Sequence, residues 1–127
     1  MDRSAIRRWI PAAGFALLLL VTSLVPIPAN GDTAVPTLLG VGLDKWVHAV
    51  SYGVLTGLLA RGRQSQDVAG VTAVVLVAIG YGAGVEVLQG FVPSRGTSGA
   101  DVLANAVGAV LAGAAVLGSL KAKLSPR

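Results

Sequence analysis

Residues 68–92 read VAGVTAVVLVAIGYGAGVEVLQGFV, and no charged side chain interrupts this run before Glu86. A helix rises about 1.5 Å per residue, so a helix of this length crosses a hydrocarbon core of about 30 Å. Uninterrupted apolar runs of this kind are typical of transmembrane helices. The run therefore predicts a membrane-spanning helix that carries one carboxyl group near its end.

Three other apolar segments accompany this run, at residues 9–25, 46–60 and 102–120. The segment at 46–60 is short, but it reaches spanning length if Asp44 and Lys45 lie at the membrane interface. Pro26 ends the first segment, because proline removes a backbone donor and restricts the residue before it. The expected fold class is all-α, an integral membrane four-helix bundle in which residues 1–127 form a single domain. The helices are expected at about residues 8–26, 44–60, 68–91 and 101–120.

The composition is that of a membrane protein. Of the 127 residues, 54% are hydrophobic and 13% are charged, whereas about 25% charged residues are typical of soluble domains. Gly occurs 17 times and aromatic residues make up 5%, so the helices are expected to pack through small residues, including Gly84 and Gly108. The chain has no Cys, which excludes disulfides, thiolate catalysis and Cys-ligated metal sites.

The net charge of +4 comes largely from basic residues at the ends of the apolar segments. They are Arg3, Arg7, Arg8, Arg61, Arg63, Lys121, Lys123 and Arg127. Cytoplasmic loops carry such an excess of Lys and Arg, so the predicted localisation is the cell membrane, multi-pass, with both termini cytoplasmic. The sequence has no basic stripe with interleaved aromatic residues, and nucleic acid is therefore not an expected partner.

The first apolar segment has a second interpretation, a cleaved signal peptide. Arg7 and Arg8 precede its apolar core, and residues 27–29 weakly resemble a cleavage site. The core is longer than a usual signal-peptide core, which favours a retained helix. Cleavage would leave three helices and would not change the side that the polar residues face.

Polar and ionisable side chains gather near one edge of the apolar segments. Pairs of them are three or four residues apart, namely Asp44 and His48, His48 and Tyr52, Glu86 and Gln89, and Asp101 and Asn105. Residues at these spacings share a helix face. Three distant segments therefore converge at one depth, on the predicted outer side. Burying such groups in hydrocarbon costs several kcal/mol each, so they indicate a functional site.

Several of these residues also have purely structural explanations. Asp101 could cap a helix N-terminus, where an acid interacts favourably with the helix dipole. Lys45 and Arg95 could be interfacial residues that extend toward water. His48 and Glu86 could satisfy one another and hold the bundle together. No residue spacing is specific to a metal site, so no metal ligand is assigned.

The ordered polar positions resemble the signature of the VanZ-like family of small membrane proteins. The resemblance covers about residues 44–113 and rests on Asp44, Lys45, His48, Tyr52, Gly82, Glu86, Gln89, Pro93, Arg95, Asp101, Asn105 and Gly108. Ala49 departs from the family pattern, in which an aromatic residue commonly follows the histidine. The founding member is associated with resistance to teicoplanin, a glycopeptide antibiotic that acts on lipid-linked cell-wall precursor at the outer membrane face. The resemblance therefore implies a cell-envelope setting and a link to antibiotic resistance.

The expected function is to bind or act on a membrane lipid or lipid-linked envelope precursor in an outward-facing pocket. The expected binding residues are Asp44, Lys45, Tyr52, Gln89, Arg95 and Asn105. Lys45 and Arg95 would attract a phosphate or carboxylate, because cations are effective at a surface of low dielectric. His48, Glu86 and Asp101 would be the catalytic residues if the protein carries out chemistry.

Three classes of function stay open. A binding or shielding protein needs the pocket but tolerates a changed His48, whereas a membrane hydrolase or transferase loses turnover without it. A proton-coupled transporter would need polar groups that continue to the inner face, where the sequence has almost none. No cofactor is assigned, and a homo-oligomer stays open as a partner.

Overall fold

The computed structural model describes residues 2–26, 35–64 and 66–125. The elements follow one another as α1 (Arg3–Leu24), β1 (Thr37–Leu38), β2 (Val41–Gly42), α2 (Leu43–Gly62), α3 (Val68–Gln89) and α4 (Gly99–Leu124). The prediction of four helices packed into a bundle is confirmed. The short β1–β2 hairpin is an addition that the sequence patterns did not predict.

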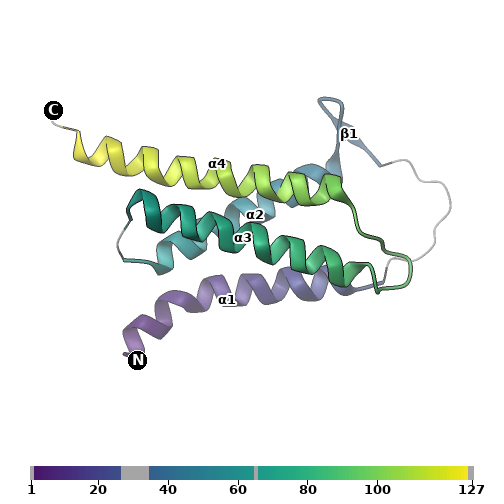
Figure 1. Ribbon diagram of the computed structural model, residues 1–127, viewed down its shortest axis with the longest axis horizontal. Coiled ribbons are helices and arrows are strands. Elements are labelled where there is room, and N and C mark those ends of the chain that lie inside the picture. The colour runs from purple at the N-terminus through teal and green to yellow at the C-terminus, as the bar shows by residue number, and fades with distance from the viewer. Residues whose placement is uncertain (1, 27–34, 65, 126–127) are drawn as a thin grey trace.

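Successive helices run in opposite directions along the bundle (Figure 1). The start of α1 and the end of α4 lie at the same end, and the hairpin lies at the other (Figure 1). α2 packs most extensively on α4 and also contacts α1 and α3. This arrangement is the one that both termini on the same membrane side would require, while the side itself stays a prediction.

Three of the described helices, α1, α3 and α4, are long and apolar enough to cross a membrane. The chain is therefore a multi-pass membrane protein. A fourth crossing is expected at α2, which is not among the candidate spans found in the described ranges by length and composition, so this crossing stays a prediction. Its polar residues, among them Asp44, Lys45 and His48, lower its hydropathy. Lys45 and His48 contact partners on α4.

Helix boundaries follow from capping. α1 begins at Arg3, earlier than predicted, because the Asp2 carboxylate accepts a hydrogen bond from the Ser4 amide at 3.4 Å. It ends at Leu24, before Pro26. α4 begins after Ser98, whose hydroxyl oxygen accepts from the Asp101 amide at 3.3 Å. Such caps satisfy backbone groups that the helix itself leaves unpaired.

Small residues bring α2, α3 and α4 together. A side chain at Gly108 would collide with the carbonyl oxygen of Ala49, so α4 lies directly on the α2 backbone. A Cβ at Gly82 would lie 2.8 Å from Tyr52 Cε1, so the tyrosine ring lies against α3. A Cβ at Gly84 would have nothing within 4 Å. The expected close contact is therefore confirmed at Gly108 and wrong at Gly84, which faces away from the bundle.

The β1–β2 hairpin lies in the connection between the first two helices, where the sequence predicted no strand; residues 27–34 lie outside the described residues. Leu38 pairs with Val41 in the antiparallel register. The connecting residues Leu39 and Gly40 have positive φ angles of 54° and 76°, as a two-residue hairpin turn requires. Trp46 Nε1 donates to the Leu38 carbonyl at 3.0 Å, which joins the hairpin to the first turns of α2.

Candidate functional site

The polar cluster lies at the end of the bundle that carries the hairpin. The start of α2, the end of α3 and the start of α4 meet there (Figure 1). Each of the three helices brings two or more of the residues singled out in the sequence. The spacing of those residues along each helix directs them to common faces, and the antiparallel packing places the faces together.

Lys45 occupies the centre of an ion-paired group between α2 and α4. Its Nζ lies 2.6 Å from Asp44 Oδ2 and 2.5 Å from Asp101 Oδ1. The Asp101 side chain is 16% exposed, against 44% for Asp44. The Lys45–Asp101 pair is therefore the better shielded from solvent, and it joins the beginnings of two helices.

His48 continues this group toward the bundle interior. Its Nδ1 lies 3.0 Å from Asn105 Oδ1, and its Nε2 lies 3.6 Å from Asp101 Oδ2. Because an amide oxygen only accepts, the Nδ1–H donates to Asn105. Asn105 is 2% exposed, so water cannot reach its side chain. The bond from His48 supplies the partner that the buried amide oxygen needs. Asp101 thus lies between Lys45 and His48 and contacts both.

Glu86 accepts a hydrogen bond from the loop before α4. It is 3% exposed, and its Oε1 accepts from the Ser98 amide at 2.7 Å. Ser98 in turn caps α4 through the Asp101 amide. Glu86 is therefore connected to Asp101 through Ser98, while His48 bonds to a different side chain. A buried carboxylate that accepts a backbone N–H fixes the loop geometry, which is a structural role.

Gln89 and Arg95 bind the end of α1. Gln89 Nε2 donates to the Ser23 carbonyl at 3.0 Å. Arg95 Nε donates to the Val25 carbonyl at 2.7 Å, and its Nη2 donates to that of Thr22 at 3.3 Å. The Thr22 and Ser23 carbonyls lie in the last turn of α1 and Val25 is its C-cap residue, so no intrahelical donor remains for them. Gln89 and Arg95, both far from α1 in the sequence, therefore cap that helix and hold it against the cluster.

A cavity of about 140 Å³ lies between these groups. Its walls come from α1, α2, the end of α3 and the loop that follows, as Leu19, Thr22, Ser23, Val47, His48, Ser51, Tyr52, Gln89 and Arg95. Four of the predicted site residues thus share one cavity. The α1 residues and Ser51 were missed by the sequence analysis, which treated the first helix as a generic apolar segment. Two polar residues just before Pro26 were the signal that could have indicated them.

Lys45 lines a different recess. An apolar groove of about 410 Å³ lies between α2 and α4, and its walls are Val41, Lys45, Trp46, Ala49, Ala100, Leu103, Ala104 and Val107. Lys45 is the one charged residue among them. Tyr52, Gln89 and Arg95 therefore line one recess and Lys45 lines another, while the predicted binding residues Asp44 and Asn105 line neither.

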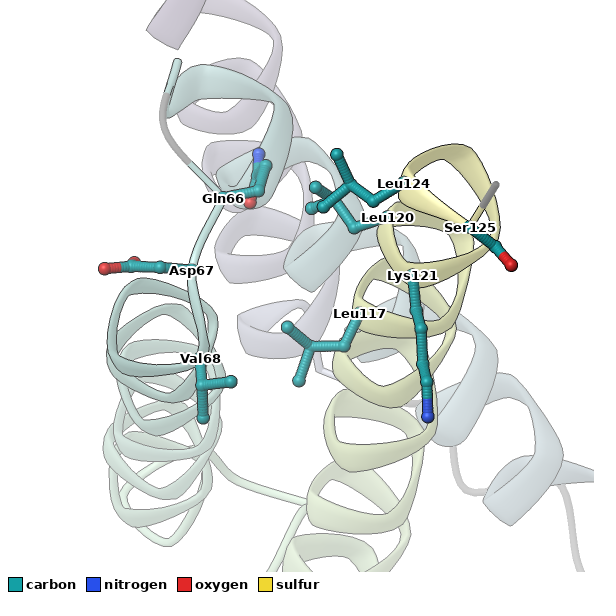
Figure 2. Close-up of a pocket in the computed structure, with 8 residues that line it drawn as sticks. All are labelled: Gln66, Asp67, Val68, Leu117, Leu120, Lys121, Leu124 and Ser125. Carbon is teal, nitrogen blue, oxygen red and sulfur yellow. The ribbon is translucent and has the colours of Figure 1, made fainter. Parts of the chain in front are cut away.

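A further recess lies at the opposite end of the bundle, between the start of α3 and the end of α4 (Figure 2). It measures about 420 Å³. Leu117, Leu120 and Leu124 form one wall, while the Asp67 carboxylate points away from them (Figure 2). None of the polar cluster belongs to this recess, so it is not the candidate site.

The chemistry of the 140 Å³ cavity is that of one cation with neutral donors and acceptors. Arg95 supplies the guanidinium, Gln89 an amide, Ser51 and Tyr52 hydroxyl groups, and His48 an imidazole. Across the described ranges, no group of three or more His, Asp and Glu side chains is placed to hold a metal ion. Such a set of side chains can pair with an anion and exchange hydrogen bonds with neutral polar groups.

A sequence model of the VanZ/LLP1 family matches residues 4–120. The match extends over all four helices, whereas the resemblance seen in the sequence began near Asp44. No curated protein and no solved structure matches the chain significantly. The family match covers most of the chain and agrees with the membrane helices of the fold. The chain therefore belongs to the VanZ/LLP1 family and is a multi-pass membrane protein of that family.

Proposed function

We propose that this protein binds the head group of a lipid or lipid-linked cell-envelope component in the 140 Å³ cavity at the hairpin end of the bundle. The observation that carries the proposal is the lining, in which Arg95, Gln89, His48 and Ser51 border one space together with apolar Val47. A polar recess in a membrane-spanning bundle needs a polar occupant, because hydrocarbon cannot satisfy its groups.

Arg95 supplies the attraction for an anion. Its hydrogen-bond partners in the described part of the chain are the carbonyls of Thr22 and Val25, which carry no net charge. The bonds fix the guanidinium in place, and no acid among the described residues forms an ion pair with it. Pre-oriented guanidinium groups bind phosphate and carboxylate well, because no side-chain entropy is lost on binding.

Lys45 has a different part in this proposal from the one expected at first. It lies between the carboxylates of Asp44 and Asp101, so its charge is already compensated twice. Its place at the apolar groove suits contact with a lipid chain along its methylene groups. The anion-binding role therefore rests on Arg95, and Lys45 holds α2 to α4.

The arrangement favours binding over catalysis. Among the three candidate catalytic residues, Glu86 accepts a loop amide, Asp101 pairs with Lys45, and His48 donates through Nδ1 to Asn105. A general base needs a lone pair within reach of the proton that it removes. His48 Nε2 carries the lone pair of the neutral ring, and the Asp101 carboxylate lies 3.6 Å from it. Of the three candidates His48 alone lines the 140 Å³ cavity, so they do not surround one reacting group there.

Retention of lipids by the purified protein tests the proposal. Native mass spectrometry would follow the lipids that remain bound to the wild type, to Ser51→Leu and to Arg95→Gln. Ser51→Leu fills the cavity, and Arg95→Gln removes the cation, so each should lower head-group binding by about tenfold or more. Lys123→Gln, at the far end of the bundle, serves as the control and should leave binding unchanged.

Because Arg95 also caps α1, its variant is interpreted only with a matched melting curve. Ser51→Leu removes none of the hydrogen bonds described here, so it isolates the cavity from the cap. A folded Ser51→Leu protein that keeps the wild-type lipids would contradict the proposal. Release of a modified lipid product, lost in His48→Ala, would instead support the alternative of a membrane hydrolase or transferase.

A further inference from the structure

Three arginines converge on one cleft at the end of the bundle opposite the polar cluster. A recess of about 340 Å³ is lined by Arg7, Arg8, Pro11 and Arg61. Arg7 and Arg8 belong to the first turns of α1, and Arg61 belongs to the last turn of α2. Residues more than fifty positions apart in the sequence thus bring like charges together.

The packing between α1 and α2 forces this convergence. Gly62 follows Arg61, and a Cβ at Gly62 would lie 2.6 Å from Trp9 Cε3. Trp9, which follows Arg8, therefore packs closely against the end of α2. The ring can take this position only because Gly62 has no side chain. Close α1–α2 packing at this point places the three guanidinium groups around one recess, although like charges repel.

Among the described acids, Asp2 attracts Arg8, but none forms an ion pair with Arg7, Arg8 or Arg61. Asp2 is bonded to the amide and hydroxyl of Ser4, and Asp67 accepts from the Gly70 amide and lies 3.9 Å from an Arg63 nitrogen. The other described acids, Asp44, Glu86 and Asp101, belong to the polar cluster at the far end. Within the described ranges, Arg8 Nε is buried and has no hydrogen-bond partner. A desolvated, unpaired N–H is costly, so it indicates a missing acceptor.

We propose that this cleft, the arginine cleft, binds the phosphate of an anionic phospholipid. Three guanidinium groups match the oxygens of a phosphate with charge-assisted hydrogen bonds. Basic recesses between transmembrane helices are also known to hold anionic head groups. The apolar α1 surface beside the cleft, including Ile10, which is 57% exposed, gives the acyl chains a place to lie. This phospholipid site is distinct from the head-group cavity at the hairpin end.

The test compares two charge-matched double variants in nanodiscs. Arg8→Gln with Arg61→Gln removes two cleft charges, and Arg3→Gln with Lys123→Gln removes two basic charges at the same end outside the cleft. In titrations with short-chain phosphatidylglycerol followed by native mass spectrometry, the cleft variant should bind at least about tenfold more weakly than the control variant. Equal affinities of the two variants would show that only the general surface charge matters, and would overturn the proposal.

Thermal melting gives a second readout that misfolding cannot imitate. In phosphatidylglycerol nanodiscs the wild type should melt above the cleft variant, because a ligand that binds only the folded state stabilises it. In phosphatidylcholine nanodiscs the two melting temperatures should be equal, or the cleft variant should melt above the wild type, because the substitutions relieve the repulsion among the arginines. A cleft variant that melts below wild type by the same margin in both lipids would contradict the proposal. Arg7→Gln provides an independent single variant for the same comparison.

Inorganic phosphate distinguishes a lipid from a soluble anion. Millimolar phosphate should displace phosphatidylglycerol only weakly, because it lacks the acyl chains that lie along α1. Stabilisation of the detergent-purified protein by phosphate, without any response to phosphatidylglycerol, would assign the cleft to a soluble anion. That result would overturn the lipid part of the proposal.

Discussion

His48 Nδ1 and Asn105 Oδ1 face one another across the α2–α4 contact at 3.0 Å. Gly108 lies one turn further along α4, where that helix lies directly on the α2 backbone at Ala49. The polar contact and the close backbone approach therefore belong to the same interface. Each side chain supplies the hydrogen-bond partner that the other would lack at this packed interface.

Removing both members of this pair should cost less than the sum of the two single losses. His48→Ala leaves the buried Asn105 amide unsatisfied, and Asn105→Ala leaves the imidazole N–H unsatisfied, each at about 1–3 kcal/mol. The double variant should be more stable than the sum of the two losses predicts, by about 1 kcal/mol. Unfolding titrations in mixed detergent micelles measure all four proteins of this cycle. Losses that add to within about 0.5 kcal/mol would show that the two side chains act independently.

The two carboxylates beside Lys45 should differ in their contribution to stability. Asp101→Asn removes the shielded partner at 2.5 Å and also a neighbour of His48, so it should lower the melting temperature clearly. Asp44→Asn affects a pair whose acid side chain is 44% exposed, and exposed ion pairs contribute about 0–1 kcal/mol. Melting curves at low and high salt measure both effects. A larger loss for Asp44→Asn would mean that Lys45 binds mainly to its sequence neighbour.

Gly108 and Gly84 should respond oppositely to a single added methyl group. Gly108→Ala forces the new side chain into the Ala49 carbonyl, and overpacking of this kind costs about 1–3 kcal/mol. Gly84→Ala meets no atom within 4 Å and should gain up to about 1 kcal/mol in helix propensity. The yield of monodisperse protein in detergent and its melting temperature measure the difference. Similar behaviour of the two variants would remove the close α2–α4 approach from the fold.

The orientation in the membrane can be tested in this naturally Cys-free chain. The excess of Arg and Lys near the start of α1 and the end of α4 predicts that this end is cytoplasmic. Gly96→Cys, in the loop before α4, should react with an impermeant thiol reagent in intact cells. Gln64→Cys, in the α2–α3 connection, should react only after lysis. The reverse pattern would place the polar cluster on the cytoplasmic side.

The sequence predicted well what depends on helical periodicity. The four-residue spacing of Asp101 and Asn105 put both on one face of α4, and the structure gives both as neighbours of His48. The length of the apolar runs likewise predicted four helices. Periodicity and hydrophobicity are local properties, so they can be read without knowing how the helices pack.

Contacts through loops and helix ends could not be predicted in the same way. Glu86 bonds to the Ser98 amide because of the path of the α3–α4 loop, and Arg95 reaches α1 because of the same loop. The polar residues of α2 also keep it from being a candidate span by composition, although neighbouring helices supply partners for them. In each case the partner comes from a distant part of the sequence, and spacing along one helix carries no information about it.

A structure determined by electron cryomicroscopy in nanodiscs formed from native membrane tests the central proposal most directly. We predict density for a head group in the 140 Å³ cavity, with an anionic group against Arg95 and polar groups near Gln89 and His48. The same density should be absent from the Ser51→Leu protein. A cavity filled in the wild type only by an acyl chain, or closed by the surrounding side chains, would contradict the account.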